Sequence, residues 1–310
     1  MKRLLPLILF TLAMLPCRGQ SAGVSELPLA DPFILCHEGR YYAYGTGERG
    51  FRVYESTDLR HWNKGGIALD FDKVWGTRQF WAPEVYYVES KGLFYMFYTA
   101  EEHICVATSD SPEGPFVQDK IKPIREEKGI DASLFIDNDG KAYLYFVRFT
   151  GGNVIWAAEM DDDLKGIREE TLTECIRASE PWETIDSEVT EGPSVIRAGD
   201  TYYLLYSANH FRCKDYAIGY ATASSPLGQW NRYEGNPIFR RGFPKAGNLV
   251  GIGHGAPFRS RNGRLMYVFH AHNSVERISP RLMYINSRLK VSRSGVLKMD
   301  GKVIVPELTE

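Results

Sequence analysis

The chain has 310 residues, a formal net charge of −2 at pH 7 and 13% aromatic residues. This near-neutral charge argues against a nucleic acid or an anionic membrane as partner, because both need a concentrated basic face. Beyond the N-terminal segment, about 290 residues remain, enough for one large domain, and none of their segments is long and apolar enough to span a membrane.

The first twenty residues have the features of a secretory signal peptide. A basic start is followed by an apolar run over residues 4–16 and by small residues of the kind that a signal peptidase reads. The run is shorter than the roughly 20 apolar residues of a membrane span. Cys17 raises a lipoprotein as an alternative, although Pro16 before it fits lipidation poorly. We therefore expect export, to the periplasm or the medium, and a single mature domain over residues 21–310.

The rest of the chain contains an internal repeat that occurs five times. Each unit starts with a short segment that is small or Pro-containing and runs into a β-rich stretch; a Gly-centred turn and an aromatic strand follow. The starting segments cover residues 29–33, 81–85, 131–135, 190–195 and 254–258. The aromatic strands are predicted over residues 40–44, 93–98, 142–146, 202–206 and 265–269.

The spacing of the units indicates the fold. Aligning Trp81, Asp131, Glu191 and His254 gives steps of 50, 60 and 63 residues, and the first unit starts 52 residues before Trp81. Repeats of this length, built from several short strands, are typical of a β-propeller, in which sheets stacked around an axis bury each other's faces. The sequence therefore predicts an all-β fold: a five-bladed β-propeller with four-stranded antiparallel blades, whose five segment starts surround one axial pocket.

The remaining elements follow the same pattern. Third strands are predicted over residues 51–54, 103–108, 154–158, 217–221 and 281–285, and outer strands after aromatic residues such as Trp62, Phe116 and Trp230. Residues 169–180 are interpreted as a loop or short turn, and most aromatic side chains are expected to pack between blades. The mature chain has four cysteines, an even count that permits two disulfides: Cys36, Cys105, Cys175 and Cys213. Cys105 lies in an apolar strand and is expected to be a buried thiol.

Three of the segment starts carry acids. Asp31, Asp131 and Glu191 come from the first, third and fourth units, so the predicted propeller would bring them to one axial pocket. Each acid alone has an ordinary interpretation as a turn or strand-start residue. Together they resemble the set that glycoside hydrolysis needs, because one carboxylic acid must stay protonated while another stays ionised. Like charges at short range help to separate their pKa values.

The motifs around these positions together resemble glycoside hydrolase family 43. They are Ala30-Asp31-Pro32-Phe33-Ile34, Phe80-Trp81-Ala82-Pro83-Glu84, Ile130-Asp131-Ala132-Ser133-Leu134-Phe135, Thr190-Glu191-Gly192-Pro193 and Gly253-His254-Gly255. The resemblance covers essentially the whole mature chain and implies a five-bladed propeller with inverting chemistry on arabinose- or xylose-containing polysaccharides. It also implies that Asp31 is the general base, Glu191 the general acid, and Asp131 the residue that tunes the pKa of Glu191 and orients it.

The same resemblance implies further pocket residues. Trp81 would form a wall of the sugar subsite, Arg281 would contact substrate, and Phe33 and Ile130, beside the two aspartates, are included among the substrate-binding residues. His254 resembles an axial histidine that contacts a central calcium ion in many members, directly or through water. Calcium prefers oxygen ligands, so we expect at most a structural calcium ion in the channel and no other cofactor. His270 and His272 are interpreted as packing residues.

The specific activity is less constrained by the motifs. Short inter-blade loops favour an exo-acting α-L-arabinofuranosidase working as a monomer on a poly- or oligosaccharide. The alternatives are a β-xylosidase, a β-galactosidase or galactofuranosidase type, and a non-catalytic carbohydrate-binding propeller. Fructan-processing propellers normally show Asn before the first Asp, where this chain has Ala30, and a sialidase would need several arginines and a tyrosine nucleophile.

Overall fold

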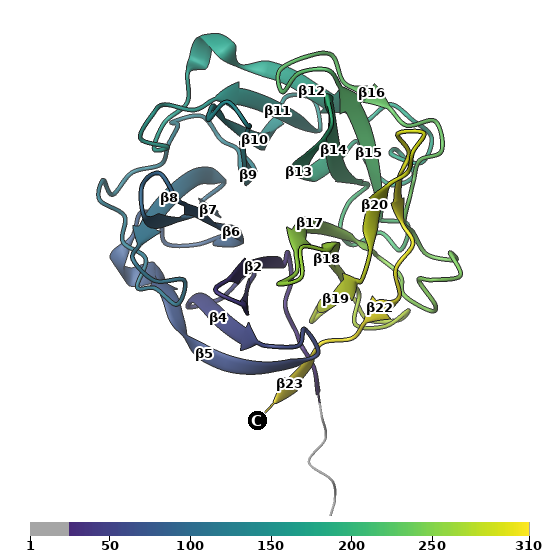
Figure 1. Cartoon of the computed structure of the whole chain (residues 1–310), viewed down its shortest axis with the longest axis horizontal. Helices are drawn as coiled ribbons and strands as arrows, with labels where there is room; N and C mark the ends of the chain where they lie inside the picture. The colour runs from purple at the N-terminus through teal and green to yellow at the C-terminus, as the bar shows by residue number, and fades with distance from the viewer. Residues whose placement is uncertain (1–24, 310) are drawn as a thin grey trace, which may run out of the picture.

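The computed structural model describes residues 25–309, in which five sheets are arranged as blades around a central axis (Figure 1). The predicted signal peptide, residues 1–20, lies outside the described residues. The innermost strand of each blade starts close to the axis, so the prediction of an all-β five-bladed propeller is confirmed. No helix in residues 25–309 has the length and apolar character that a membrane crossing requires.

The strands of each blade follow one another outward from the axis, in sequence order. Blade one contains β2 (Phe33–His37), β3 (Arg40–Tyr44), β4 (Gly50–Ser56) and β5 (His61–Asp70). Blade two contains β6 (Trp81–Val88), β7 (Leu93–Ala100) and β8 (His103–Ser109). Blade three contains β9 (Ile130–Ile136), β10 (Ala142–Phe149), β11 (Asn153–Glu159) and β12 (Thr173–Arg177).

The last two blades repeat the pattern. Blade four contains β13 (Thr190–Ala198), β14 (Thr201–Ala208), β15 (Ala217–Ala223) and β16 (Asn231–Arg232), and blade five contains β17 (Gly253–Arg259), β18 (Leu265–Ala271), β19 (Leu282–Asn286) and β22 (Val303–Ile304). The hairpin of β20 (Leu289–Val291) and β21 (Leu297–Met299) projects from blade five. Two 3₁₀ turns, η1 (Phe71–Lys73) and η2 (Glu169–Thr171), lie in connections.

Two outer positions differ from the expectation. In blade two, the fourth strand is reduced to an isolated antiparallel bridge between Thr108 and Val117. In blade three, the segment interpreted as a loop contains the outer strand β12, so that interpretation is wrong for residues 173–177. Only Ile176 of these five residues is buried, which is why the segment lacks the apolar alternation that signals a strand.

The core is divided among the five interfaces between neighbouring blades. Each interface has its own apolar cluster, and the alternation of side chains along the aromatic strands explains how one strand serves two of them. On β14, Leu204 and Tyr206 pack toward blade three, whereas Tyr203 and Leu205 pack toward blade five. The expected packing of aromatic residues between blades is thus confirmed.

The ring is closed by both ends of the described chain. β23 (Glu307–Thr309) pairs in parallel with β5, and β1 (Ser25–Glu26) pairs antiparallel with β23 (Figure 1). The backbone of Leu27 links the two neighbouring blades: its N–H donates to the carbonyl of Pro306 and its carbonyl accepts from the N–H of Met283, both at 3.0 Å. This closure leaves the edge of blade one covered, as a propeller requires.

The four cysteines of the described chain form no disulfide with one another, although their even number permitted two. Cys105 is buried in β8, as expected from its apolar neighbours.

Candidate active site

Each blade begins with a backbone kink beside the axis. One residue at each start has a positive φ: Asp31 (51°), Ala82 (45°), Asp131 (58°), Gly192 (56°) and His254 (37°). Four of these are not glycine, and the left-handed region is uncommon for such residues and costs conformational energy. The fivefold recurrence shows that the kink belongs to the blade plan, and it turns the side chains at the strand start toward the axis.

The strand registers define which residues are equivalent. Trp81 pairs with Thr99, Ile130 with Val147, Glu191 with Ser207 and Gly253 with His270. Trp81 and Glu191 therefore precede the kinked residue of their blades, whereas Asp131 and His254 are the kinked residues. The sequence alignment that equated all four was off by one residue in blades two and four.

The N–H group of each kinked residue is bound by the preceding blade. In four blades the acceptor is a side chain at the end of, or just beyond, a second strand: His270 for Asp31 (3.1 Å), Thr46 for Ala82 (3.1 Å), Thr99 for Asp131 (3.2 Å) and Ser207 for His254 (2.8 Å). The corresponding residue of blade three is Val147, which has no acceptor. The N–H of Gly192 instead donates to Asp131 Oδ2 at 3.3 Å. This exception ties an axial acid to the start of blade four.

A cavity of about 330 Å³ lies where these starts meet. Its lining is Asp31, Trp81, Glu102, Ile130, Asp131, Phe149, Asn153, Glu191, His210, Phe211, His254 and Arg281. The structure thus brings together the three predicted acids with Trp81, Ile130, His254 and Arg281. The volume is at the lower end of the range of about 300–1,000 Å³ typical of small-molecule sites.

Phe33 is the exception among the predicted substrate-binding residues. It is not part of the cavity lining; it is buried in the apolar cluster between blades one and two, with its ring centroid 5.1 Å from that of Tyr86. Phe33 is the first residue of β2 and lies two positions beyond the kinked Asp31, so it already belongs to the body of the blade. Phe33 therefore supports the blade interface, and we do not include it among substrate contacts.

Asp31 is held ionised by a dense set of partners. Arg281 donates to both carboxylate oxygens, at 2.7 and 3.1 Å, and the hydroxyl of Thr46 donates to Oδ2 at 2.5 Å. Burial raises the pKa of Asp31, but the charges of Arg281 and His254 and the contact with His270 outweigh it and hold the pKa well below its usual value of 3.8. Burial and the nearby Arg281 lower the pKa of His270 to about 3, so this imidazole is neutral.

The other two acids have the opposite tendency. Burial raises the pKa of Glu191 to about 7, and the neighbouring Asp131 adds to the effect. Burial, with the charge of Asp31, raises the pKa of Asp131 to about 7 as well. The hydroxyl of Tyr216 donates to Glu191 Oε1 at 2.8 Å, and the amide of Asn153 donates to Oε2 at 3.3 Å. The cavity therefore holds one firmly ionised carboxylate and an acid that keeps its proton near neutral pH.

Asn153 and Tyr216 were not predicted from the sequence, whereas Arg281, at the equivalent position of blade five, was. Asn153, Tyr216 and Arg281 occupy one repeat position. Each lies two residues before the third-strand partner of an equivalent second-strand residue. These pairs are Val147 with Ile155, Ser207 with Ile218 and His270 with Met283. The starts of the third strands thus form a second ring around the axis. The repeat alignment, extended to the third strands, would have identified Asn153 and Tyr216.

Histidines contribute to the site differently from expectation. His270 was interpreted as a packing residue, and it is fully buried. Its Nδ1 also accepts from the N–H of Asp31 at 3.1 Å and lies 3.3 Å from Asp31 Oδ1. His254 Nδ1 lies 3.5 Å from Asp31 Oδ1 and 3.8 Å from Asp131 Oδ2. The ring of His254 therefore stands between the two aspartates.

The side chains around His254 offer few free oxygen ligands to a calcium ion. Calcium takes six to eight oxygen ligands. Within residues 25–309, no group of three or more His, Cys, Asp or Glu side chains is arranged to hold a metal ion. The carboxylate of Asp31 is engaged by Arg281 and Thr46. A structural calcium ion stays an untested prediction, and no step below depends on it.

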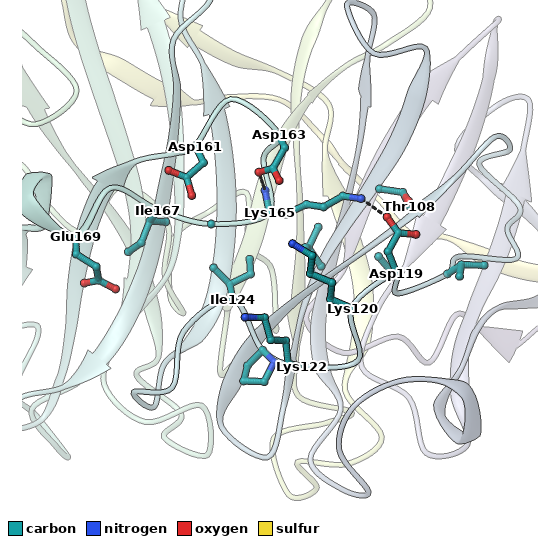
Figure 2. Close-up of a pocket in the computed structure, with 15 residues that line it drawn as sticks. Thr108, Asp119, Lys120, Lys122, Ile124, Asp161, Asp163, Lys165, Ile167 and Glu169 are labelled. Atoms are coloured by element: carbon teal, nitrogen blue, oxygen red, sulfur yellow. Dashed lines mark hydrogen bonds and ion pairs between the residues drawn. The ribbon is translucent and has the colours of Figure 1, made fainter.

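A second cavity, of about 360 Å³, lies away from the axis on the outer side of blades two and three (Figure 2). It shares no lining residue with the axial cavity, and its lining is largely ionic, with Lys120, Lys122 and the ion pair between Lys165 and Asp119. It has no aromatic lining residue on which a sugar could stack and holds none of the three axial acids.

The comparisons with known proteins identify the family of this chain. The family model described as glycosyl hydrolases family 43 matches residues 23–289. A crystal structure named as an endo-1,4-β-xylanase of Bacteroides thetaiotaomicron is 51% identical, with a TM-score of 0.89, and the match covers 93% of this chain and 100% of that one. A thermostable family-43 glycoside hydrolase is 38% identical, with a TM-score of 0.81 and coverage of 90% and 95%.

A protein named as the extracellular exo-α-(1→5)-L-arabinofuranosidase of Cellvibrio japonicus is 24% identical over 320 residues, covering 90% of this chain and 88% of that one. The family match reaches into all five blades and includes every residue that lines the axial cavity. This chain therefore belongs to glycosyl hydrolases family 43 and is an inverting glycoside hydrolase.

Proposed function

We propose that Asp31 is the general base, Glu191 the general acid and Asp131 the residue that tunes Glu191. The observation that carries this assignment is the separation of pKa values, low for Asp31 and about 7 for Glu191. Asp31 removes a proton from a water molecule while the oxygen of that water attacks the anomeric carbon. Glu191 gives its proton to the departing glycosidic oxygen. The N–H of Asp131 donates to Thr99, and its carboxylate accepts from the N–H of Gly192. From this position the charge of Asp131 raises the pKa of Glu191.

The substrate is a pentoside of plant-type polysaccharides or oligosaccharides. A cavity of about 330 Å³, with Trp81 as an aromatic wall, is suited to one sugar ring. The first candidate activity is that of an α-L-arabinofuranosidase, supported by the Cellvibrio relative, which matches along nearly its whole length. The second is β-1,4-xyloside hydrolysis, favoured by the 51% identity to the structure named as a xylanase.

A panel of aryl glycosides tests both candidates. We expect kcat/KM for p-nitrophenyl α-L-arabinofuranoside or β-D-xylopyranoside to exceed that for β-D-galactopyranoside by at least about tenfold, a preference that one sugar substituent can give. The anomeric configuration of the first product, followed by NMR, is expected to be inverted. Activity on none of the pentosides would contradict the substrate assignment. If both Asp31→Asn and Glu191→Gln keep their activity, the proposed residue roles are contradicted.

The expected export and the expected monomeric state are part of the same proposal. The pattern of residues 1–20 supports export, and the Cellvibrio relative is named as extracellular. Cell fractionation of the full chain and sequencing of the mature N-terminus test the first, and size-exclusion chromatography with light scattering tests the second. A protein that is found inside the cell and still carries residues 1–20 would contradict export.

A further inference from the structure

A larger groove lies beside the axial cavity, between blades one and five. Its volume is about 780 Å³, and its lining comes from the segment before Asp31, the β3–β4 connection, β4, β5 and the segment before β19. The lining includes Thr46, Glu48, Arg49, Tyr54, Ile67 and Arg281. None of the three axial acids is among them.

The groove adjoins the axial cavity on the side of Asp31. Arg281 lines both spaces and binds the carboxylate of Asp31 in a bidentate pair. Thr46 lines the groove and donates to the same carboxylate at 2.5 Å. The two spaces are therefore separated by the Arg281 side chain, and a molecule in the groove lies next to the general base, whereas Glu191 belongs to blade four across the axis.

The chemistry of the groove is suited to a neutral sugar segment. Glu48 and Arg49 stand exposed at its rim, where carboxylate and guanidinium groups can bind sugar hydroxyls. Tyr54 is half-buried and Ile67 is 42% exposed, so both offer apolar surface to the carbon face of a sugar ring. Opposite charges at the rim do not select an ionic ligand.

The position of the groove decides what part of a substrate it can hold. In an inverting reaction, water attacks from the face opposite the leaving group, so the leaving group departs toward the acid and away from the base. A groove beside Asp31 therefore does not receive the leaving group. We propose that it is a second sugar subsite. It binds one or more sugar residues that are attached to the reacting sugar on the side away from the scissile bond. The enzyme then prefers substrates with a chain on both sides of the scissile bond, unlike the exo-acting enzyme expected from the sequence.

This inference rests on the proposed function and is tested by chain length. We expect kcat/KM to be at least about fivefold higher for the p-nitrophenyl glycoside of xylobiose or arabinobiose than for that of the single pentose, in the series that the enzyme accepts. The first product released is then the disaccharide. Equal values for the two lengths, with only single pentoses released, would overturn the second subsite and leave the proposed function intact. Activity on neither length would instead refute the proposed function.

Substitutions in the groove locate the effect. Arg49→Ala and Ile67→Ala are each expected to reduce the ratio of the two kcat/KM values by about threefold or more. Arg293→Ala is the matched control, because Arg293 is exposed in the turn of the β20–β21 hairpin, outside the groove. Calorimetric titration of the Glu191→Gln variant with oligosaccharides of one to five residues gives an independent result. Affinity that stops rising at one residue would overturn the proposal.

Discussion

Tyr216 donates a hydrogen bond to Glu191 Oε1 at 2.8 Å while its ring stacks on His270, with centroids 5.9 Å apart. His270 in turn contacts the backbone and carboxylate of Asp31. One buried side chain therefore touches the proposed acid and, through a single neighbour, the proposed base. Gly253 makes room for it, because a Cβ there would lie 2.1 Å from the tyrosine ring.

Replacing Tyr216 by Phe should make Glu191 a weaker acid. The hydrogen bond from Tyr216 stabilises the ionised carboxylate of Glu191. Without this bond the pKa of Glu191 rises above about 7. We expect the descending limb of kcat/KM against pH to move to higher pH by about one unit. Tyr206→Phe is the matched control, since its hydroxyl binds Glu183 and it does not line the cavity. A limb that stays in place in both variants would show that Tyr216 has no part in tuning the acid.

The unmodified enzyme should be active in acid and lose activity as the pH rises through about 7. Glu191 must carry its proton, and its pKa is about 7; Asp31 must be ionised, and its pKa lies well below 3.8. We therefore expect a plateau of kcat/KM over mildly acidic pH, with the fall on the acidic side below about pH 4. The measurement is a profile on an aryl pentoside, in a range where circular dichroism shows the fold to be intact. Activity that increases through pH 7 would exclude Glu191 as the acid.

Much of this site follows from repeat symmetry, which the sequence displays. Asp31, Asp131 and Glu191 could be predicted because each stands at a strand start in a recognisable unit, and equivalent positions in a propeller reach the axis together. The exact offset could not be predicted, because the one-residue difference between Glu191 and the kinked Gly192 depends on backbone φ and strand register.

Other parts depend on contacts that sequence patterns do not encode. Phe33 and Trp81 both are aromatic residues at strand starts, yet one is core and the other lines the cavity. Their places relative to the kink differ: Trp81 precedes the kinked Ala82, whereas Phe33 follows the kinked Asp31 by two residues. Similarly, His270 lies within an apolar strand, but it contacts Asp31, which belongs to another blade and is 239 residues away in the sequence.

Leaving-group dependence distinguishes the roles of the two principal carboxyl groups. Glu191→Gln should reduce kcat/KM on natural glycosides by about 10²–10⁴-fold but far less on substrates with an activated leaving group, which need little protonation. Asp31→Asn should lose activity on both kinds, because water stays unactivated. The measurement is a series of aryl pentosides of decreasing phenol pKa. If the two variants respond alike to the series, the assignment of acid and base is wrong.

Val147 offers a change of the opposite sign from Tyr216. It occupies the position where blades two and four use Thr99 and Ser207 to bind the N–H of the next kink. In Val147→Thr, the new hydroxyl is expected to accept from Gly192, which then no longer donates to Asp131. The pKa of Asp131 rises and its charge decreases, so the pKa of Glu191 falls.

We therefore expect the descending limb of Val147→Thr to move to lower pH, by roughly half a unit or more. Val147→Ala, which removes volume but supplies no acceptor, controls for packing and should destabilise the fold without this shift. A shift to higher pH, or an equal shift in both variants, would contradict the role given to the Gly192 hydrogen bond.

Stability should depend strongly on one ion pair whose residues do not line the axial cavity. Glu183 is completely buried and accepts from Arg232 Nε at 2.9 Å, from the hydroxyl of Tyr206 at 2.5 Å and from the N–H of Ser179 at 2.9 Å. Arg232→Ala leaves this carboxylate without its cation, and we expect the free energy of unfolding to fall by about 2–4 kcal/mol.

The control for Arg232 is Arg241, which pairs with Asp215 at 2.5 Å but has a side chain 45% exposed to solvent. Water screens that pair, so Arg241→Ala should cost less than about 1 kcal/mol. Urea unfolding followed by fluorescence compares the variants at one pH. Equal losses would mean that the burial of Glu183 does not set the cost. A larger loss in Arg232→Ala that disappears when Glu183 is also changed to Gln would show that the unpaired carboxylate is its cause.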